Sequence, residues 1–532
     1  MISNMKILQR EEYPALKPVN HHEFVSKKLD FLCFHFMRSS HDDLKKIGNV
    51  VDDLLYFIKE KIFICNNFLQ YVDSFYSIIC FNRDISNGKG ERDITYMLIC
   101  VLYKHFPDKA TSCVNVLPNI GSWADIKYFC GFVNFHGSSY GLDAVSISAL
   151  INHAVEIIVF QFRYDYNLWN SVFNEYLSKD SCSQRPNAKF IISNVAKWIP
   201  REKNKYGWLF DKIVENYFNT SDNKYDSDFN LNKKRSIFRK MVSSLCRELD
   251  VLERKLCNNK WADIEYKNIN LGAFFTYHKA LLEGRSAYTN AVDRDLCKEF
   301  MMEGLLNNNF DNTEDNNEFF IRSKRLNVSM GKLVKMGFDL IKRPYTQVVS
   351  SQMAFVNNIW KKVLKKHGNS GNFGKYLLPI IDSSIDLSND TFRQIIGMSL
   401  FTGSVSPLKR IVVFKNDFFE TLIVDESLEF IDLLRNFVDF DRSIYVKFSS
   451  CIEKLYSGFN YLKQPLKIIF FSNNKNVFSQ EFSLISNQYT NYIFWNLGTC
   501  DFNECNFEMF EKLYDDGARF LSGSCVNLIQ EL

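Results

Sequence analysis

The hydrophobic pattern changes its period near residue 375. Before that point, from about residue 41 to 300, apolar residues recur at three- and four-residue spacing, as in 44–65, 68–80, 94–106 and 144–161. This spacing is typical of amphipathic helices, and strand-like alternation is scarce. Short polar turns join several of these segments, and helical patterning returns at 320–365. The pattern predicts stacked helix pairs, as in an α-solenoid, although no strict sequence period accompanies them.

From residue 375 onward, short apolar runs alternate with helical stretches. The predicted strands are 376–381, 410–414, 420–424, 467–471, 492–497 and 518–521. The predicted helices between and after them are 391–401, 427–438, 444–459, 507–515 and one from residue 525. Such alternation is typical of a doubly wound parallel sheet with helices on both faces. The predicted fold class is therefore α plus α/β, an all-helical HEAT-like solenoid or ring followed by a parallel-sheet domain.

These patterns give a division of the chain. Residues 1–40 are predicted as an N-terminal extension and 41–366 as the helical module, which contains a flexible Asn-rich insertion at 303–319. The stretch HGNSGNFG at 367–374 has the composition of a linker, and 375–532 form the second domain. A chain of 532 residues is long enough for two or three domains, each with a sizeable core.

The composition indicates the cellular compartment of the protein but says little about its function. Hydrophobic residues make up 46% and charged residues 24%, and the net charge of +4 requires that any basic surface be local. The 14 cysteines include no Cys-x-x-Cys pair, which favours reduced thiols in a cytoplasmic protein over a zinc site. The N-terminus lacks an apolar signal segment and no run of 18 apolar residues occurs, so no membrane partner is expected.

Two basic stretches of the helical part are candidate binding sites. The turn NRDISNGKGER at 82–92 contains Gly-Lys-Gly, but it follows no predicted strand and lacks the spacing of a phosphate-binding loop. No nucleotide cofactor is therefore expected there, and a helix-capping turn or an RNA-facing turn remain open. Residues 231–260 hold nine Lys or Arg against three acids, a local net of +6. This segment is either a solvated helix face or a surface that contacts phosphates.

A third candidate is the apolar strand at the start of the second domain. Its run LLPII ends in Asp382, Ser384 and Asp386, which are spaced two apart and so point the same way from an extended chain. The carboxyl end of such a strand is where open α/β sheets bind ligands. These oxygens could hold a divalent metal ion, or they could cap helices and fix loops by hydrogen bonds.

Several blocks of sequence, in order from about residue 45 to the end, carry a family resemblance. They are RDISNGKGER at 83–92, GSWAD at 121–125, AKWIP at 196–200, the segment 238–261, FWNL at 494–497 and GARFLSG at 517–523. Together they resemble a family of plants, protists and large DNA viruses that joins a TROVE-like helical module to a von Willebrand factor A (vWA) domain. A more distant similarity is to the Ro autoantigen, a ring of HEAT-like helices closed by a vWA domain that binds structured small RNAs.

The resemblance implies a metal-ion-dependent adhesion site in the vWA domain, and this sequence departs from it. Asp382 and Ser384 match the first two ligands, but Asp386 replaces a serine. The threonine position falls at Ser443, and the final aspartate is replaced by Asn473. Because Mg²⁺ is strict about octahedral oxygen geometry, these changes predict a degenerate site. No cofactor is expected, with Mg²⁺ as the alternative.

No nucleophile–base arrangement with a workable spacing is present, and the nine histidines are dispersed, so an enzyme is not expected. The resemblance and the local basic charge favour an RNA-binding protein, a component of a Ro-like ribonucleoprotein. The alternative is a protein-interaction scaffold, of viral origin or otherwise, that uses the vWA top face and the helical groove. The predicted RNA contacts are Arg83, Lys89, Arg92, Lys197, Arg201, Arg235, Arg239 and Lys240.

Overall fold

The structure is a computed structural model of the full chain. It describes residues 21–22, 24–26, 28–29, 41–178, 188–219, 230–265, 269, 271–283, 291–306, 329–368, 376–381, 390–415, 418–438, 466–472, 492–497 and 519–522.

The first part of the chain is a stack of helices. They are α2 (His41–Ile62), α3 (Leu69–Arg83), α4 (Asp93–His105), α5 (Pro107–Ile120), α6 (Trp123–His136) and α7 (Ala144–Ser178), with short 3₁₀ turns at Asn66–Phe68 and Gly137–Tyr140. Neighbours in sequence pack on one another, α4 on α5, α5 on α6 and α6 on α7. The helices predicted at 44–65, 68–80 and 94–106 lie within a turn of α2, α3 and α4, whereas α7 begins where 144–161 was predicted and continues 17 residues further, to Ser178.

The stack continues through shorter helices. These are α8 (Ala188–Ile191), α9 (Val195–Trp198), α10 (Gly207–Asn219), α11 (Leu231–Glu248) and α12 (Leu252–Cys257). One core of buried side chains runs from Val25 to Leu249 and includes Phe75, Phe129 and Phe162. Burial of this apolar surface holds the stack together.

The longest helix, α7, belongs to this core. By length and composition alone its stretch Ala144–Tyr176 is apolar enough to cross a membrane. Its apolar side chains Leu150, Val155 and Phe162 are nevertheless buried in the helical stack. These residues place one face of α7 in the core, whereas Val145 and Phe160 of the same helix are exposed.

A second core joins the remaining helices to the sheet. It extends from Trp261 to Leu521 and covers α13 (Leu271–Leu282), α14 (Ala291–Leu306), α16 (Met330–Ile341) and α17 (Gln347–Gly368) as well as the strands. Helix α16 packs on α18 (Asp390–Val405), where a Cβ atom at Gly397 would lie 2.7 Å from Met330 Cβ. Glycine thus permits the close approach of the two helices.

The sheet has six strands in the order β3-β2-β1-β4-β5-β6. They are β1 (Leu377–Ile381), β2 (Arg410–Lys415), β3 (Phe418–Ile423), β4 (Lys467–Ser472), β5 (Tyr492–Asn496) and β6 (Arg519–Ser522), each close to a predicted strand. All neighbours are parallel except β2 and β3. The expectation of a purely parallel sheet was therefore wrong at one edge. Only two residues separate β2 from β3, and so short a connection permits only an antiparallel hairpin.

The first two residues of the predicted linker at 367–374 belong to a helix instead. Helix α17 continues to Gly368, and His367 is buried with its ring against Phe401. The predicted insertion at 303–319 was wrong for its first four residues, which are the end of α14. Residues 307–319 and the rest of the predicted linker lie outside the described residues.

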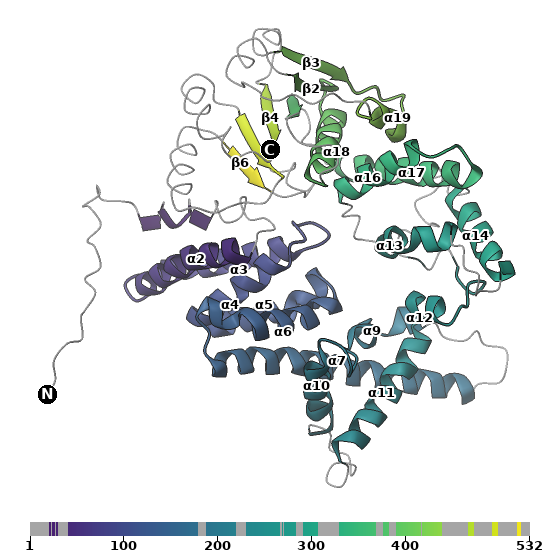
Figure 1. Ribbon diagram of the computed structural model, residues 1–532. Helices are drawn as coiled ribbons and strands as arrows, with labels where there is room; N and C mark the ends of the chain where they lie inside the picture. Colours follow the sequence, from purple (N-terminus) through teal and green to yellow (C-terminus); the bar gives the residue numbers. More distant parts are fainter. Residues whose placement is uncertain are drawn as a thin grey trace.

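The elements follow one another around a ring-shaped course (Figure 1). The course closes where the end of α17 meets the turn after α3. There Lys366 Nζ donates a hydrogen bond of 3.2 Å to the carbonyl oxygen of Ser86, and Phe81 packs against the second core. Residues 280 positions apart in sequence thus become neighbours.

Candidate functional site: a basic and aromatic pocket

The predicted metal ligands Asp382, Ser384, Asp386, Ser443 and Asn473 all lie outside the described residues. The strands that precede two of them are neighbours, with Ile381 of β1 paired to Phe471 of β4. In the described part of the chain, no group of three His, Cys, Asp or Glu is placed to hold a metal ion.

Arg83, the first predicted RNA contact, is instead half of a buried ion pair. Its Nε and Nη2 donate to the two carboxylate oxygens of Asp125 at 2.8 and 2.9 Å, and only 5% of the residue is exposed. Tyr96 and the backbone N–H of Ser122 donate to the same carboxylate at 2.6 and 2.7 Å. Burial alone raises the pKa of Asp125, but the Arg83 hydrogen bonds and charge outweigh it and hold the pKa below its ordinary value.

The two motifs 83–92 and 121–125 are therefore joined by this pair, and Arg83 is withdrawn as an RNA contact. Lys89 is withdrawn as well, because only 6% of it is exposed. Arg92 stays at the surface, where its guanidinium lies 4.8 Å from the ring centre of Tyr128. A cation over an aromatic face is held there by the ring's quadrupole.

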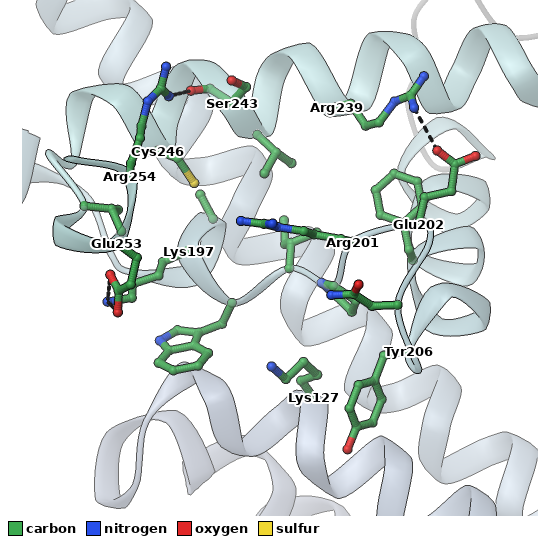
Figure 2. A pocket seen from close by; sticks show the side chains of 18 of the residues that line it. Lys127, Lys197, Arg201, Glu202, Tyr206, Arg239, Ser243, Cys246, Glu253 and Arg254 are labelled. Carbon is green, nitrogen blue, oxygen red and sulfur yellow. Dashed lines mark hydrogen bonds and ion pairs between the residues drawn. The ribbon is translucent and has the colours of Figure 1, made fainter. Parts of the chain in front are cut away.

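A pocket of ≈ 970 Å³ opens between α6, the segment 196–206, α11 and α12. Figure 2 shows Arg201 extending into it, with Lys127 and Tyr206 on the side of α6 and Cys246 on the side of α11. Its basic lining residues are Lys127, Lys197, Arg201, Lys203, Arg239 and Arg254, and its acidic ones are Glu202 and Glu253.

The segment that forms the floor of the pocket is anchored at its start by Asp165 of α7. This carboxylate is buried and accepts hydrogen bonds from Ser193 N at 3.1 Å, Ser193 Oγ at 2.5 Å and Gln161 Nε2 at 2.7 Å. Burial without a cation raises the pKa of Asp165. Further along, Ile199 and Pro200 are buried. Arg201 and residues 203–205, which lie between them and α10, are exposed.

Aromatic rings form one wall. The Lys127 ammonium lies 4.5, 5.1 and 5.7 Å from the ring centres of Tyr128, Trp198 and Tyr206. Tyr206 reaches this position because Gly131 of α6 has no side chain, since a Cβ atom there would lie 2.5 Å from Tyr206 Cε1. The rings hold the lysine by cation–π attraction without neutralising its charge.

Two of the six pocket cations have carboxylate partners. Lys197 pairs with Glu253 at 3.0 Å, and Arg239 pairs with Glu202 at 2.8 Å. For the other four, no carboxylate of the described residues lies within ion-pair distance: Lys127, Arg201, Lys203 and Arg254. Both acids of the pocket are therefore engaged, and four positive charges remain for an anion.

Three of the pocket cations influence the thiol of Cys246, which lies in the pocket wall. Burial raises the pKa of Cys246, while Arg254, Lys197 and Arg201 each oppose the rise. The three cations come from three segments, α12, α9 and the loop after it, and converge beside α11. Such a focus of positive charge in a partly enclosed space favours the binding of anions.

No family model, curated protein or solved structure matches the chain. A proposal for the function therefore rests on the chemistry of the pocket and on the resemblance of the sequence motifs.

The structure brings three of the predicted RNA contacts together in this pocket, Lys197, Arg201 and Arg239. Arg235 lies beside it but is engaged by Asp211 at 2.7 Å, and Lys240 is exposed on α11 outside the lining. Sequence reasoning missed Lys127, Arg254 and the aromatic wall as contacts. Trp198 and Arg254 stood within noted motifs, whereas no signal in the sequence pointed to Tyr206.

Proposed function

We propose that the protein binds RNA through this pocket and the exposed basic face of α11 beside it. The observation that carries the proposal is the set of four cations without carboxylate partners beside Trp198 and Tyr206. Cations without internal partners are free to replace the counterions of phosphates, which is the main source of nucleic-acid affinity. Guanidinium groups such as that of Arg201 also fit phosphate oxygens in bidentate geometry.

The aromatic wall supports RNA over a small inorganic anion. Half-buried Trp198 and Tyr206 line the pocket with part of their ring surface. Unstacked bases of single-stranded RNA bind to such rings by stacking, which contributes roughly 1–3 kcal/mol per base. Phosphate contacts and base contacts are thus available within one recess.

The architecture supports a wider assignment within the same proposal. The helical stack is proposed to be a HEAT-like, TROVE-type module, and the sheet a vWA domain with a degenerate metal site. Support comes from the ring-shaped course and from the strand order, in which successive strands are added to one side of β1 as far as β3 and to its other side from β4 onward. A non-enzymatic role, the absence of a cofactor and a cytoplasmic location remain predictions.

The test is binding of structured small RNAs to the full chain at 50 and 200 mM salt. The double variant R201Q/R254Q removes two unpaired pocket charges, and K332Q/K335Q removes two exposed lysines of α16 as a matched control. We expect R201Q/R254Q to weaken binding at least tenfold. The slope of log K against log salt concentration should become shallower by about 0.7–0.9 for each phosphate contact that is lost. Equal affinity of wild type and R201Q/R254Q, or no binding at 50 mM salt, would refute the proposal.

A protein-binding role has its own supporting feature on α7. Phe160 is 74% exposed and, with Trp123 and Pro118, lines a second cavity of ≈ 330 Å³. Exposed aromatic residues beside a cavity are typical anchors of protein interfaces. This scaffold role predicts a partner whose binding is lost in Phe160→Ser and retained in R201Q/R254Q, as measured by pull-down with both variants.

A further inference from the structure

The place of the pocket's charges indicates which part of an RNA it takes. Arg201 extends into the pocket and Arg254 lies along α11, with Cys246 beside both (Figure 2). Arg254 Nη1 donates a hydrogen bond to the carbonyl oxygen of Ser243 at 3.1 Å, which fixes that side chain on the wall. Its remaining guanidinium donors and all those of Arg201 have no partner among the described side chains.

The size of the recess limits what can enter. A volume of ≈ 970 Å³ is at the upper end of pockets for small molecules and corresponds to a few nucleotides at most. A folded RNA helix is far larger and can only lie across the opening. A strand therefore enters by an end or by a short unpaired stretch.

The charge of the phosphate group distinguishes the end of an RNA strand from an internal stretch. An internal phosphodiester carries one negative charge and two free oxygens, whereas a terminal phosphate monoester carries about −1.5 to −2 and three strong acceptor oxygens. Arg201 and Arg254 both line the pocket, and together their guanidinium groups have enough donors for three oxygens. No carboxylate is left unpaired in the lining to repel the second negative charge.

We infer that this pocket binds the terminal phosphate monoester of an RNA strand, with Arg201 and Arg254 as its anchors and the adjoining base against Trp198 or Tyr206. The inference rests on the proposed RNA-binding function and adds the chemical group that is recognised. Phosphorylated 5′ and 3′ ends present the same monoester, and the experiment distinguishes them.

The test uses the full chain and one single-stranded oligonucleotide sequence with a 5′-phosphate, a 3′-phosphate or hydroxyls at both ends. Fluorescence anisotropy gives the three dissociation constants. We expect at least one phosphorylated form to bind about tenfold more tightly than the hydroxyl form, equivalent to about 1.4 kcal/mol. R201Q/R254Q should abolish the difference, and K332Q/K335Q should retain it.

A second readout follows the thiol. Bound terminal phosphate should protect Cys246 from alkylation, measured by mass spectrometry of peptides, while Cys65, which does not line the pocket, serves as an internal reference. Equal binding of all three oligonucleotides would overturn the inference but leave the proposed RNA binding intact. Absence of binding for all three would refute both. Stronger competition by a phosphoserine peptide than by the phosphorylated oligonucleotide would overturn the inference in favour of a protein ligand.

Discussion

The buried pair of Arg83 and Asp125 allows a sharp test of how the helical module is held together. Asp125→Asn keeps the shape of the side chain and removes its charge. The side chains of Arg83 and Asp125 are 6% and 1% exposed, so the remaining guanidinium would stay buried without a counter-charge. Breaking a buried ion pair by removing one partner destabilises a protein by about 3–5 kcal/mol.

The size of the effect follows from the core to which the pair belongs. Helices α3 and α6 both contribute to the first core, which spans a little over 200 residues. For a unit of this size, melting falls by about 2–4 °C per kcal/mol, so we expect a loss of roughly 6–20 °C. Two separate cores make a single two-state transition unsuitable as the assay. Hydrogen exchange of amides in α3 to α6 is the better measurement, with loss of protection confined to the first core.

The pH dependence of stability gives a second test of the Arg83–Asp125 pair. The folded-state pKa of Asp125 lies below the ordinary pKa of an aspartate, so its contribution to stability is present above that ordinary pKa and is lost as pH falls through the lowered pKa. Asp125→Asn lacks this contribution. The difference in stability between wild type and variant should therefore be largest near neutral pH and should shrink below about pH 4.

The matched control is Asp73→Asn, which removes the same charge from an exposed pair in the same module. Asp73 lies 2.5 Å from Lys109, and both side chains are well exposed. Exposed pairs contribute about 0–1 kcal/mol, so this variant should melt within a few degrees of wild type. A loss below about 1 kcal/mol for Asp125→Asn, or a difference between variant and wild type that does not change with pH, would refute the reasoning.

Three further outcomes are expected. Gly131→Ala should push Tyr206 from its place over α6, lower the stability of the first core by about 1–3 kcal/mol and weaken RNA binding, as measured by hydrogen exchange and anisotropy together. Gly397→Ala should force α18 away from Met330 and lower the stability of the second core by a similar amount while RNA affinity is unchanged. Glu253→Gln removes one of two pocket carboxylates and should tighten RNA binding by roughly two- to fivefold at low salt, and a weakening would count against phosphate binding there.

The sheet was largely predictable because its signals are local. The run LLPII is buried at all five positions, and a strand buried on both faces reads as a continuous apolar run. Strands β2, β4 and β5 likewise have an apolar run of strand length bounded by polar residues. The antiparallel edge was missed because the alternation rule was applied to the whole domain, although the predicted strands 410–414 and 420–424 leave only five residues between them, too few for a parallel crossover.

The site was less predictable because its residues meet only in three dimensions. Arg83 was read as a surface cation beside a glycine turn, and nothing near it in sequence shows that its partner lies 42 residues away. Lys127 and Asn258 stand at opposite ends of the pocket's sequence range, and four segments between and including them form its walls. Local charge counting found the +6 segment, but it could not tell which cations are neutralised by Glu202 and Glu253.

The buried pair and the pocket are nevertheless connected through one short helix. Asp125 is fixed at the start of α6 by Arg83, Tyr96 and Ser122, and Lys127 follows two residues later on the same turn. A helix whose first turn is fixed in this way presents Lys127 to the aromatic wall with little freedom, so less conformational entropy is lost when an anion binds. The GSWAD motif at 121–125, one of the blocks that carry the family resemblance, would then act on the proposed RNA binding indirectly. Asp125→Asn should accordingly weaken binding less than R201Q/R254Q does, although it lowers stability more.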